Sequence, residues 1–151
     1  MTTPSRHPVA FDFFLEIAVI DQLVSTEMER VLPEGVSMAA FSLLNHLVSK
    51  GGSESPARLA QALQVTKGAI TALLKRLEAR GHVTLSADPR DGRGKIVALT
   101  PEGRRMREVA VAALDPLLET FLAAFPEPDL AGALPLLKRV RLDLNRRRYG
   151  G

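Results

Sequence analysis

The sequence contains no cysteine, no tryptophan, one tyrosine and three histidines. Without cysteine, the chain has no disulfide, no thiolate metal site, no cysteine nucleophile and no thiol redox switch. His7, His46 and His82 lie far apart in the sequence and have no metal-ligand spacing. A Ser/His/Asp set and a phosphate-binding glycine loop are also missing. We therefore expect a protein that is not an enzyme and that has no metal site and no cofactor.

Long apolar runs are missing as well. The chain has no run of about 18 apolar residues, and residues 1–8 are polar, without the apolar segment of a signal peptide. We therefore expect a soluble, cytoplasmic protein with no membrane partner. A length of 151 residues, 46% of them apolar, suits one domain with a substantial core, or one compact unit that grows by oligomerising.

The net charge of +3 is unevenly distributed along the chain. Residues 55–107 contain eleven lysines and arginines but four acidic residues, a surplus of seven positive charges. The rest of the chain contains nine basic and thirteen acidic residues. A charge run is often no more than a solvated face. A basic middle between acidic ends favours instead a module that binds a polyanion and is carried on a scaffold.

Apolar residues recur at helical spacing near both ends of the chain. Residues 9–31 have the three-to-four spacing of a long amphipathic helix. Two more long helices are expected over residues 100–125 and 130–148. Pro116 and Pro135 fall inside these two helices, and each removes one backbone hydrogen bond. We therefore expect a kink in each helix.

Three shorter helices are predicted between the long ones, with Ser37, Ser55 and Thr66 as N-caps. The first of them is expected to bury Phe41, Leu44, Leu47 and Val48. The second is about two turns long and has a proline at its first position. The third, residues 67–79, has an apolar stripe formed by Ile70, Leu73, Leu74 and Leu77. Gly81 is the expected glycine after its C-terminus.

The pattern then changes to two short β-prone stretches, residues 82–86 and 95–99. A loop rich in glycine, aspartate and proline separates them, so we predict a hairpin with a basic tip. Two helices joined by a tight turn and followed by a hairpin have the layout of a winged helix-turn-helix. The predicted fold class is therefore mostly α, with a small β-hairpin wing.

This layout selects candidate DNA-binding residues. The face of the 67–79 helix opposite the apolar stripe carries small or basic side chains that can enter a major groove: Lys67, Gly68, Thr71, Lys75 and Arg76. The hydroxyls of Ser55 and Thr66, at helix N-termini, suit phosphate oxygens. The hairpin adds basic side chains that can reach the minor groove or the backbone, and an aspartate placed to orient an arginine. These residues are Arg90, Arg93, Lys95 and Asp91.

Five ordered stretches in the middle of the chain carry a resemblance to a known family. They are Leu59-Ala60, Thr66-Lys67-Gly68-Ala69-Ile70-Thr71, Leu77-Glu78-Ala79-Arg80-Gly81, Asp88-Pro89-Arg90-Asp91-Gly92-Arg93 and Leu99-Thr100-Pro101-Glu102-Gly103. With them, residues 36–107 resemble the MarR family of bacterial transcription regulators. The resemblance implies a homodimer that binds double-stranded DNA at a palindromic operator, usually represses, and is often released by a small aromatic or phenolic ligand.

The resemblance also implies how the chain is divided. Residues 37–107 would form the winged helix-turn-helix lobe, while residues 9–36 and 108–148 would form the helical dimerisation region. The residues expected at the dimer interface are Phe11, Phe13, Phe14, Leu134, Leu137, Val140 and Leu144. The phenylalanine cluster could instead line an effector pocket. Any effector is expected between the helical scaffold and the DNA-binding lobe.

A second function of a different class stays open at this point. The chain could form a dimeric scaffold whose winged helix binds a protein partner rather than DNA. The surplus of seven positive charges over residues 55–107 argues against it, because a protein-binding wing has no need of clustered arginines.

Overall fold

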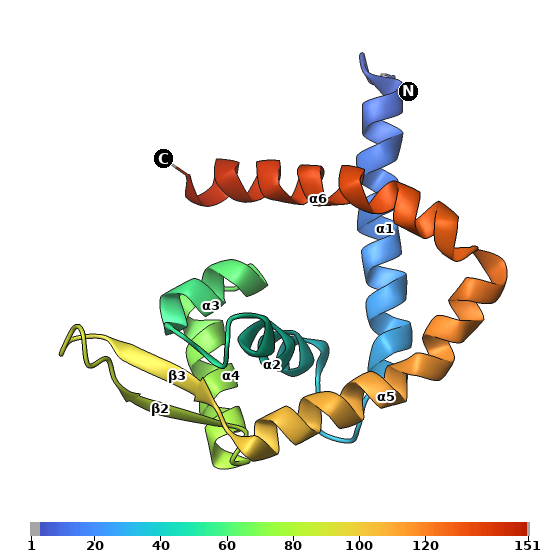
Figure 1. Ribbon diagram of the computed structural model, residues 1–151. Helices are drawn as coiled ribbons and strands as arrows, with labels where there is room; N and C mark the ends of the chain where they lie inside the picture. Colours follow the sequence, from blue (N-terminus) through green and yellow to red (C-terminus); the bar gives the residue numbers. More distant parts are fainter. Residues whose placement is uncertain (1–3, 151) are drawn as a thin grey trace.

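The computed structural model describes residues 4–150. The helices are α1 (Pro8–Val31), α2 (Met38–Ser49), α3 (Pro56–Leu63), α4 (Lys67–Ala79), α5 (Pro101–Ala124) and α6 (Glu127–Tyr149). The strands are β1 (Ser53–Glu54), β2 (Val83–Ala87) and β3 (Lys95–Leu99). Figure 1 shows α2, α3, α4 and the strands gathered in one lobe, while α1, the far half of α5 and α6 extend away from it.

The N-caps expected at Ser37, Ser55 and Thr66 are confirmed, whereas the last helix begins at Glu127 instead of at the expected residue 130. Each N-cap hydroxyl oxygen accepts a hydrogen bond from a backbone N–H three residues ahead, at 3.0–3.3 Å, in the caps Ser37, Ser55, Thr66 and Thr100. These bonds satisfy N–H groups that have no partner inside a helix. Gly81 follows the end of α4 with a φ of +76°, the left-handed conformation that glycine adopts at low cost.

The hairpin is confirmed, and the structure adds a third strand to it. β2 and β3 pair antiparallel from Val83 opposite Leu99 to Ala87 opposite Lys95. β1 pairs with the other edge of β3, so the strand order is β1-β3-β2. β1 is not predictable from the sequence, because two residues are too few to show an alternating pattern.

One apolar core holds the lobe together. It contains Val36, Ala40, Leu43, Leu44, Leu47, Leu59, Ile70, Leu73, Leu74, Leu77, Val83 and Val97. The stripe predicted on α4 is fully confirmed, but the face predicted on α2 is partly wrong. Leu43 is fully buried, while Phe41 and Val48 are half-buried. The cause is that α2 packs on α1, α3, α4, α5 and the sheet, so its contacts extend around more than one face.

The three long helices form an open frame beside the lobe (Figure 1). Neither Pro116 nor Pro135 ends its helix. The ribbon of α5 changes direction in its second half, which contains Pro116, as expected from the lost hydrogen bond (Figure 1). Among the described residues, no single helix meets the length and hydropathy of a membrane span. The pair α5 and α6 meets them together, by length and composition only, with a bend of 102° between the two.

Candidate nucleic-acid interface

The exposed face of α4 carries the candidate side chains that the sequence selects. Burial of its apolar stripe leaves Lys67, Gly68, Thr71, Lys75 and Arg76 exposed on the same helix. The Thr71 hydroxyl donates to the carbonyl oxygen of Lys67 at 2.8 Å, so its methyl group and oxygen lone pairs stay available at the surface. This face therefore offers small, basic and hydrogen-bonding groups without a bulky apolar side chain.

Gly68 has no structural explanation inside the chain. Its φ is not positive, and a Cβ built there would meet no atom within 4 Å. A glycine in a helix costs about 1 kcal/mol relative to alanine. Such a residue on an exposed helix suits a surface that must approach another backbone closely.

The two capping hydroxyls lie at the N-termini of successive helices. Ser55 is the N-cap of α3, and Thr66 is the N-cap of α4. Each oxygen accepts one backbone hydrogen bond, so each hydroxyl hydrogen remains free to donate. Free N–H groups at a helix N-terminus favour negative charge at the same place. Both positions can therefore bind phosphate oxygens.

The wing loop, residues 88–94, is ordered by its two aspartates. Asp88 Oδ1 accepts from the backbone N–H of Arg90 at 2.9 Å, and Asp91 Oδ1 accepts from that of Arg93 at 3.0 Å. A backbone bond from Asp88 N–H to the Gly94 carbonyl, 2.9 Å, closes the loop. Asp91 therefore orients Arg93 through the backbone and not through the guanidinium group, which the sequence alone did not show.

The basic side chains of the wing are free of ion pairs. Arg90, Arg93 and Lys95 are exposed, and none of them belongs to an ion pair formed by residues 4–150. The hairpin formed by β2 and β3 extends away from the body of the lobe (Figure 1). Glu78 of α4 accepts a hydrogen bond from the backbone N–H of Leu85 in β2 at 3.1 Å, which fixes the wing to α4. The wing thus presents unpaired positive charge at a fixed position.

His82, at the start of the wing, is buried and structural. Its Nδ1 has no hydrogen-bond partner within residues 4–150. Burial lowers the pKa of His82 below its ordinary value, nearby Arg80 lowers it further, and Glu102 opposes both. The neutral imidazole is therefore the form that the fold favours.

This pKa predicts a loss of stability in mild acid. Because the folded pKa is lower than the unfolded value of about 6.5, the unfolded chain binds more protons as the pH falls through that value. We expect the melting temperature to fall from pH 7.5 to pH 5, and to fall less in His82→Leu. A thermal melt at each pH measures this. The matched comparison is His46→Gln, which removes another histidine whose pKa is lowered by burial. An equal pH dependence of the melting temperature in wild type and His82→Leu would contradict a lowered pKa at His82.

A cavity of about 870 Å³ lies between the lobe and α6. Its apolar lining comes from Ile17 of α1 and from Leu137, Val140 and Leu144 of α6. Its basic lining consists of His46, Lys50, Arg141 and Arg148, with the amides of Gln64 and Asn145 beside them. No acidic residue of the described chain lines it. The sequence analysis missed these basic residues, because only the tertiary fold brings the end of α2 to α6.

A side-chain bridge spans the rim of this cavity. Gln64 Nε2 donates to Asn145 Oδ1 at 2.8 Å and also to the carbonyl oxygen of Gln61 at 2.7 Å. Gln64 lies in the turn between α3 and α4, in the left-handed conformation with a φ of +58°. The helix-turn-helix and α6 are therefore in direct contact at this point.

The residues expected at a dimer interface lie on an exposed apolar surface. Neither α1 nor α6 contains a buried residue within the described chain. Phe11, Phe14, Leu134, Leu137 and Leu144 are each at least 43% exposed. Phe13 and Val140 are half-buried, and Phe13 packs edge-on against Phe14 with ring centroids 5.3 Å apart. The structure therefore places all seven on helices that bury little within one chain.

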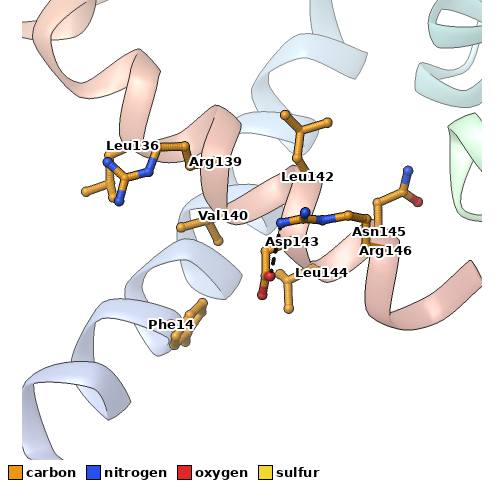
Figure 2. Close-up of a pocket in the computed structure, with 9 residues that line it drawn as sticks. All are labelled: Phe14, Leu136, Arg139, Val140, Leu142, Asp143, Leu144, Asn145 and Arg146. Atoms are coloured by element: carbon orange, nitrogen blue, oxygen red, sulfur yellow. Dashed lines mark hydrogen bonds and ion pairs between the residues drawn. The ribbon is translucent and has the colours of Figure 1, made fainter. Parts of the chain in front are cut away.

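A groove of about 610 Å³ follows the crossing of the two helices. Figure 2 shows Phe14 of α1 facing α6, with Val140 and Leu144 on the same side of that helix. Asp143 accepts hydrogen bonds from Arg146 and Arg147, at 3.4 and 2.7 Å. Arg146 and Arg147 therefore form local ion pairs with Asp143, with side chains that are 78% and 75% exposed.

No group of three or more histidine, aspartate or glutamate residues within the described part of the chain could hold a metal ion. In this fold a tight turn joins α3 to α4, a basic two-stranded wing follows, and long helices flank the lobe. This arrangement is a winged helix-turn-helix, a class of DNA-binding lobe.

Comparison with known proteins identifies the family. The MarR family profile matches residues 34–94. The multiple antibiotic resistance protein MarR of Salmonella typhimurium is 31% identical in an alignment of 105 residues that covers 64% of this chain and 72% of that protein. The chain belongs to the MarR family of transcriptional regulators, whose matched members are regulators and not enzymes.

Two further relatives place the chain within this group. The transcriptional activatory protein BadR of Rhodopseudomonas palustris is 33% identical in an alignment of 101 residues that covers 64% of this chain and 57% of BadR. The match thus spans little more than half of BadR. A crystal structure of a MarR mutant from E. coli complexed with operator DNA superposes with a TM-score of 0.75 and 25% identity. The superposition covers 90% of this chain and 98% of the E. coli chain.

Proposed function

We propose that this protein regulates transcription by inserting α4 into the major groove of an operator and the wing into the adjacent minor groove. The observation that carries the proposal is the unpaired basic surface formed by the face of α4 and the wing tip. The contacts proposed are Ser55, Thr66, Lys67, Gly68, Thr71, Lys75, Arg76, Arg90, Asp91, Arg93 and Lys95. Gly68 supports the proposal independently, because an exposed helical glycine with no internal role suits close approach to DNA.

We also propose that the functional unit is a homodimer formed by residues 9–36 and 108–148, with residues 37–107 as the DNA-binding lobe. Helices α1 and α6 expose a series of large apolar side chains. A surface of that kind in a single chain marks an interface. A second copy supplies the same apolar series across a two-fold axis, so each helix is covered by its own counterpart.

Two-fold symmetry determines the operator. The two copies of α4 in a dimer, its recognition helices, enter successive major grooves about one helical turn apart, and the two half-sites are inverted repeats. We propose that the operator is palindromic and that occupancy of a promoter by the dimer represses transcription, since a bound dimer excludes other proteins from the same DNA.

The test is fluorescence anisotropy with DNA from upstream of the gene against scrambled DNA, in a series of salt concentrations. We expect tight binding with a strong preference for the upstream fragment, and an affinity that falls steeply as salt rises because bound phosphates release counterions. No binding to either DNA at low salt would overturn the proposal. It would favour the alternative in which the winged helix binds a protein partner.

The cavity between the lobe and α6 supports the proposal of a small effector. Apolar side chains from α1 and α6 can cover a ring, while Lys50, Arg141 and Arg148 can bind a carboxylate or phenolate. We propose that a small aromatic acid or phenol binds there. It releases DNA only if it binds better to a dimer whose recognition helices have a different spacing.

Benzoate and phenols are the probes for this site. We expect a hit to raise the melting temperature and to lower the affinity for operator DNA, because it binds the folded protein and disfavours the DNA-bound spacing. In Arg141→Met the same probe should bind at least about fivefold more weakly, since one charge-assisted hydrogen bond is lost. A full set of probes that leaves DNA affinity unchanged would show a regulator without such an effector.

A further inference from the structure

Arg80, the residue after α4, is bound to the loop that connects α1 with α2. Its Nη1 donates to the carbonyl oxygen of Gly35 at 2.7 Å. Gly35 has a φ of +77°, and a Cβ built on it would overlap the Arg80 guanidinium group. Any side chain at residue 35 would therefore displace the arginine. The loop and the end of α4 are closely fitted to each other at this point.

The next two residues of the chain are bound to the start of α5. The Thr100 hydroxyl donates to the Gly81 carbonyl at 2.5 Å, and the Thr100 backbone N–H donates to the His82 carbonyl at 3.1 Å. Gly103, in the first turn of α5, packs so closely on the His82 carbonyl that a Cβ there would overlap it. Residues 80–82, the α4 junction, are therefore fixed on two sides.

These two sides are the chain connections between the lobe and the long helices. The loop over residues 32–37 joins α1 to the lobe, and α5 leaves the lobe toward α6. Leu32 packs with Ala110 and Leu114 of α5, so the two connections are also packed on each other. The α4 junction thus contacts both chain connections between the lobe and the long helices.

We propose that Arg80 is a positioning residue that sets the spacing of the two recognition helices in the dimer. The inference rests on the proposed two-half-site function. At the C-terminal end of α4, the Arg80 guanidinium group donates to the Gly35 carbonyl of the loop between α1 and α2, whereas Lys67, Gly68 and Thr71 occupy the N-terminal turns of α4. Arg80 acts on DNA binding through α4 and contacts no phosphate.

The test compares Arg80→Met with wild type on operators whose half-sites differ in spacing. The reference operator is selected from random duplexes with the wild-type dimer, and one base pair is then inserted or removed at its centre. Each change moves a half-site by about 3.4 Å along the axis. In Arg80→Met we expect about tenfold weaker binding to the reference operator. The penalty for a changed spacing should become several times smaller, because the recognition helices are less firmly held.

Two measurements separate positioning from other roles. A phosphate contact would reduce the salt dependence of binding by about one unit of slope, whereas a positioning residue leaves that slope unchanged. Size-exclusion chromatography and thermal melts check that the variant is folded and dimeric. Gly35→Ala removes the same contact by displacing the guanidinium group and retains the charge, so it should reproduce the loss of spacing preference. Arg105→Met, at an exposed arginine paired with Glu102 on α5 and absent from the proposed DNA contacts, is the matched control.

The outcomes are distinct. Equal weakening at all spacings with a reduced salt slope makes Arg80 a phosphate contact and overturns the inference. Unchanged affinity and unchanged spacing preference in both Arg80→Met and Gly35→Ala also overturn it. A wild-type protein that binds DNA without any spacing preference would overturn the two-half-site proposal, and this inference with it.

Discussion

Leu134→Asp is expected to convert the protein to a monomer and to lower operator affinity by about a thousandfold or more. Leu134 lies on α6 and is 48% exposed in a single chain, within the apolar series proposed as the dimer interface. A buried, unpaired carboxylate at a two-fold interface appears twice and costs several kcal/mol. A monomer then binds one half-site at a time, so most of the specific affinity is lost.

Sedimentation or size-exclusion chromatography gives the oligomeric state, and anisotropy gives the affinity. Leu134→Met is the matched control, because it keeps an apolar side chain of similar volume and should stay dimeric. Circular dichroism checks that the lobe, whose core lies elsewhere, stays folded. A Leu134→Asp protein that remains a dimer with full operator affinity would remove α6 from the interface.

Arg93→Ala is expected to weaken operator binding by about 1–3 kcal/mol, or roughly fivefold to more than a hundredfold. Arg93 is exposed at the wing tip, and its backbone N–H is held by the Asp91 carboxylate at 3.0 Å. The guanidinium group belongs to no ion pair formed by residues 4–150. It is therefore free to enter a minor groove, and the negative potential of a minor groove is strongest where the groove is narrow.

The control for this variant is Arg30→Ala, which also removes one positive charge but from α1, where Arg30 pairs with Glu27 at 2.7 Å. Long-range electrostatics alone would weaken binding similarly in both variants. A contact made by Arg93 weakens binding in its own variant and changes the preference at the base pairs beneath the wing. Unchanged affinity in Arg93→Ala would falsify the wing assignment.

The lobe could be predicted from the sequence because its signals are local. A capping hydroxyl, a proline or glycine at a boundary and an apolar stripe act within four residues of each other, so α4 was located to the residue. The same holds for β3 and for the glycine that ends α4. The candidate DNA-binding face of α4 followed from the buried stripe on its other side.

The rest depends on contacts between distant residues, which no local pattern contains. Gly35 and Arg80 are 45 residues apart, and Gln64 and Asn145 are 81 residues apart. The basic lining of the cavity is assembled from α2 and α6 in the same way. The α2 face was predicted only in part for a related reason: Leu44 and Leu47 are buried as expected, but an element surrounded by neighbours has no single buried side.

Hydroxyl-radical footprinting on the selected operator tests the central claim most directly, because it reports which sugars the protein covers on each strand. We expect two protected patches related by two-fold symmetry, centred about one helical turn apart on one face of the duplex. We also expect flanking minor-groove protection that disappears in Arg93→Ala. One asymmetric patch, or no protection at concentrations that saturate anisotropy, would contradict a dimer that reads two half-sites through α4 and the wing.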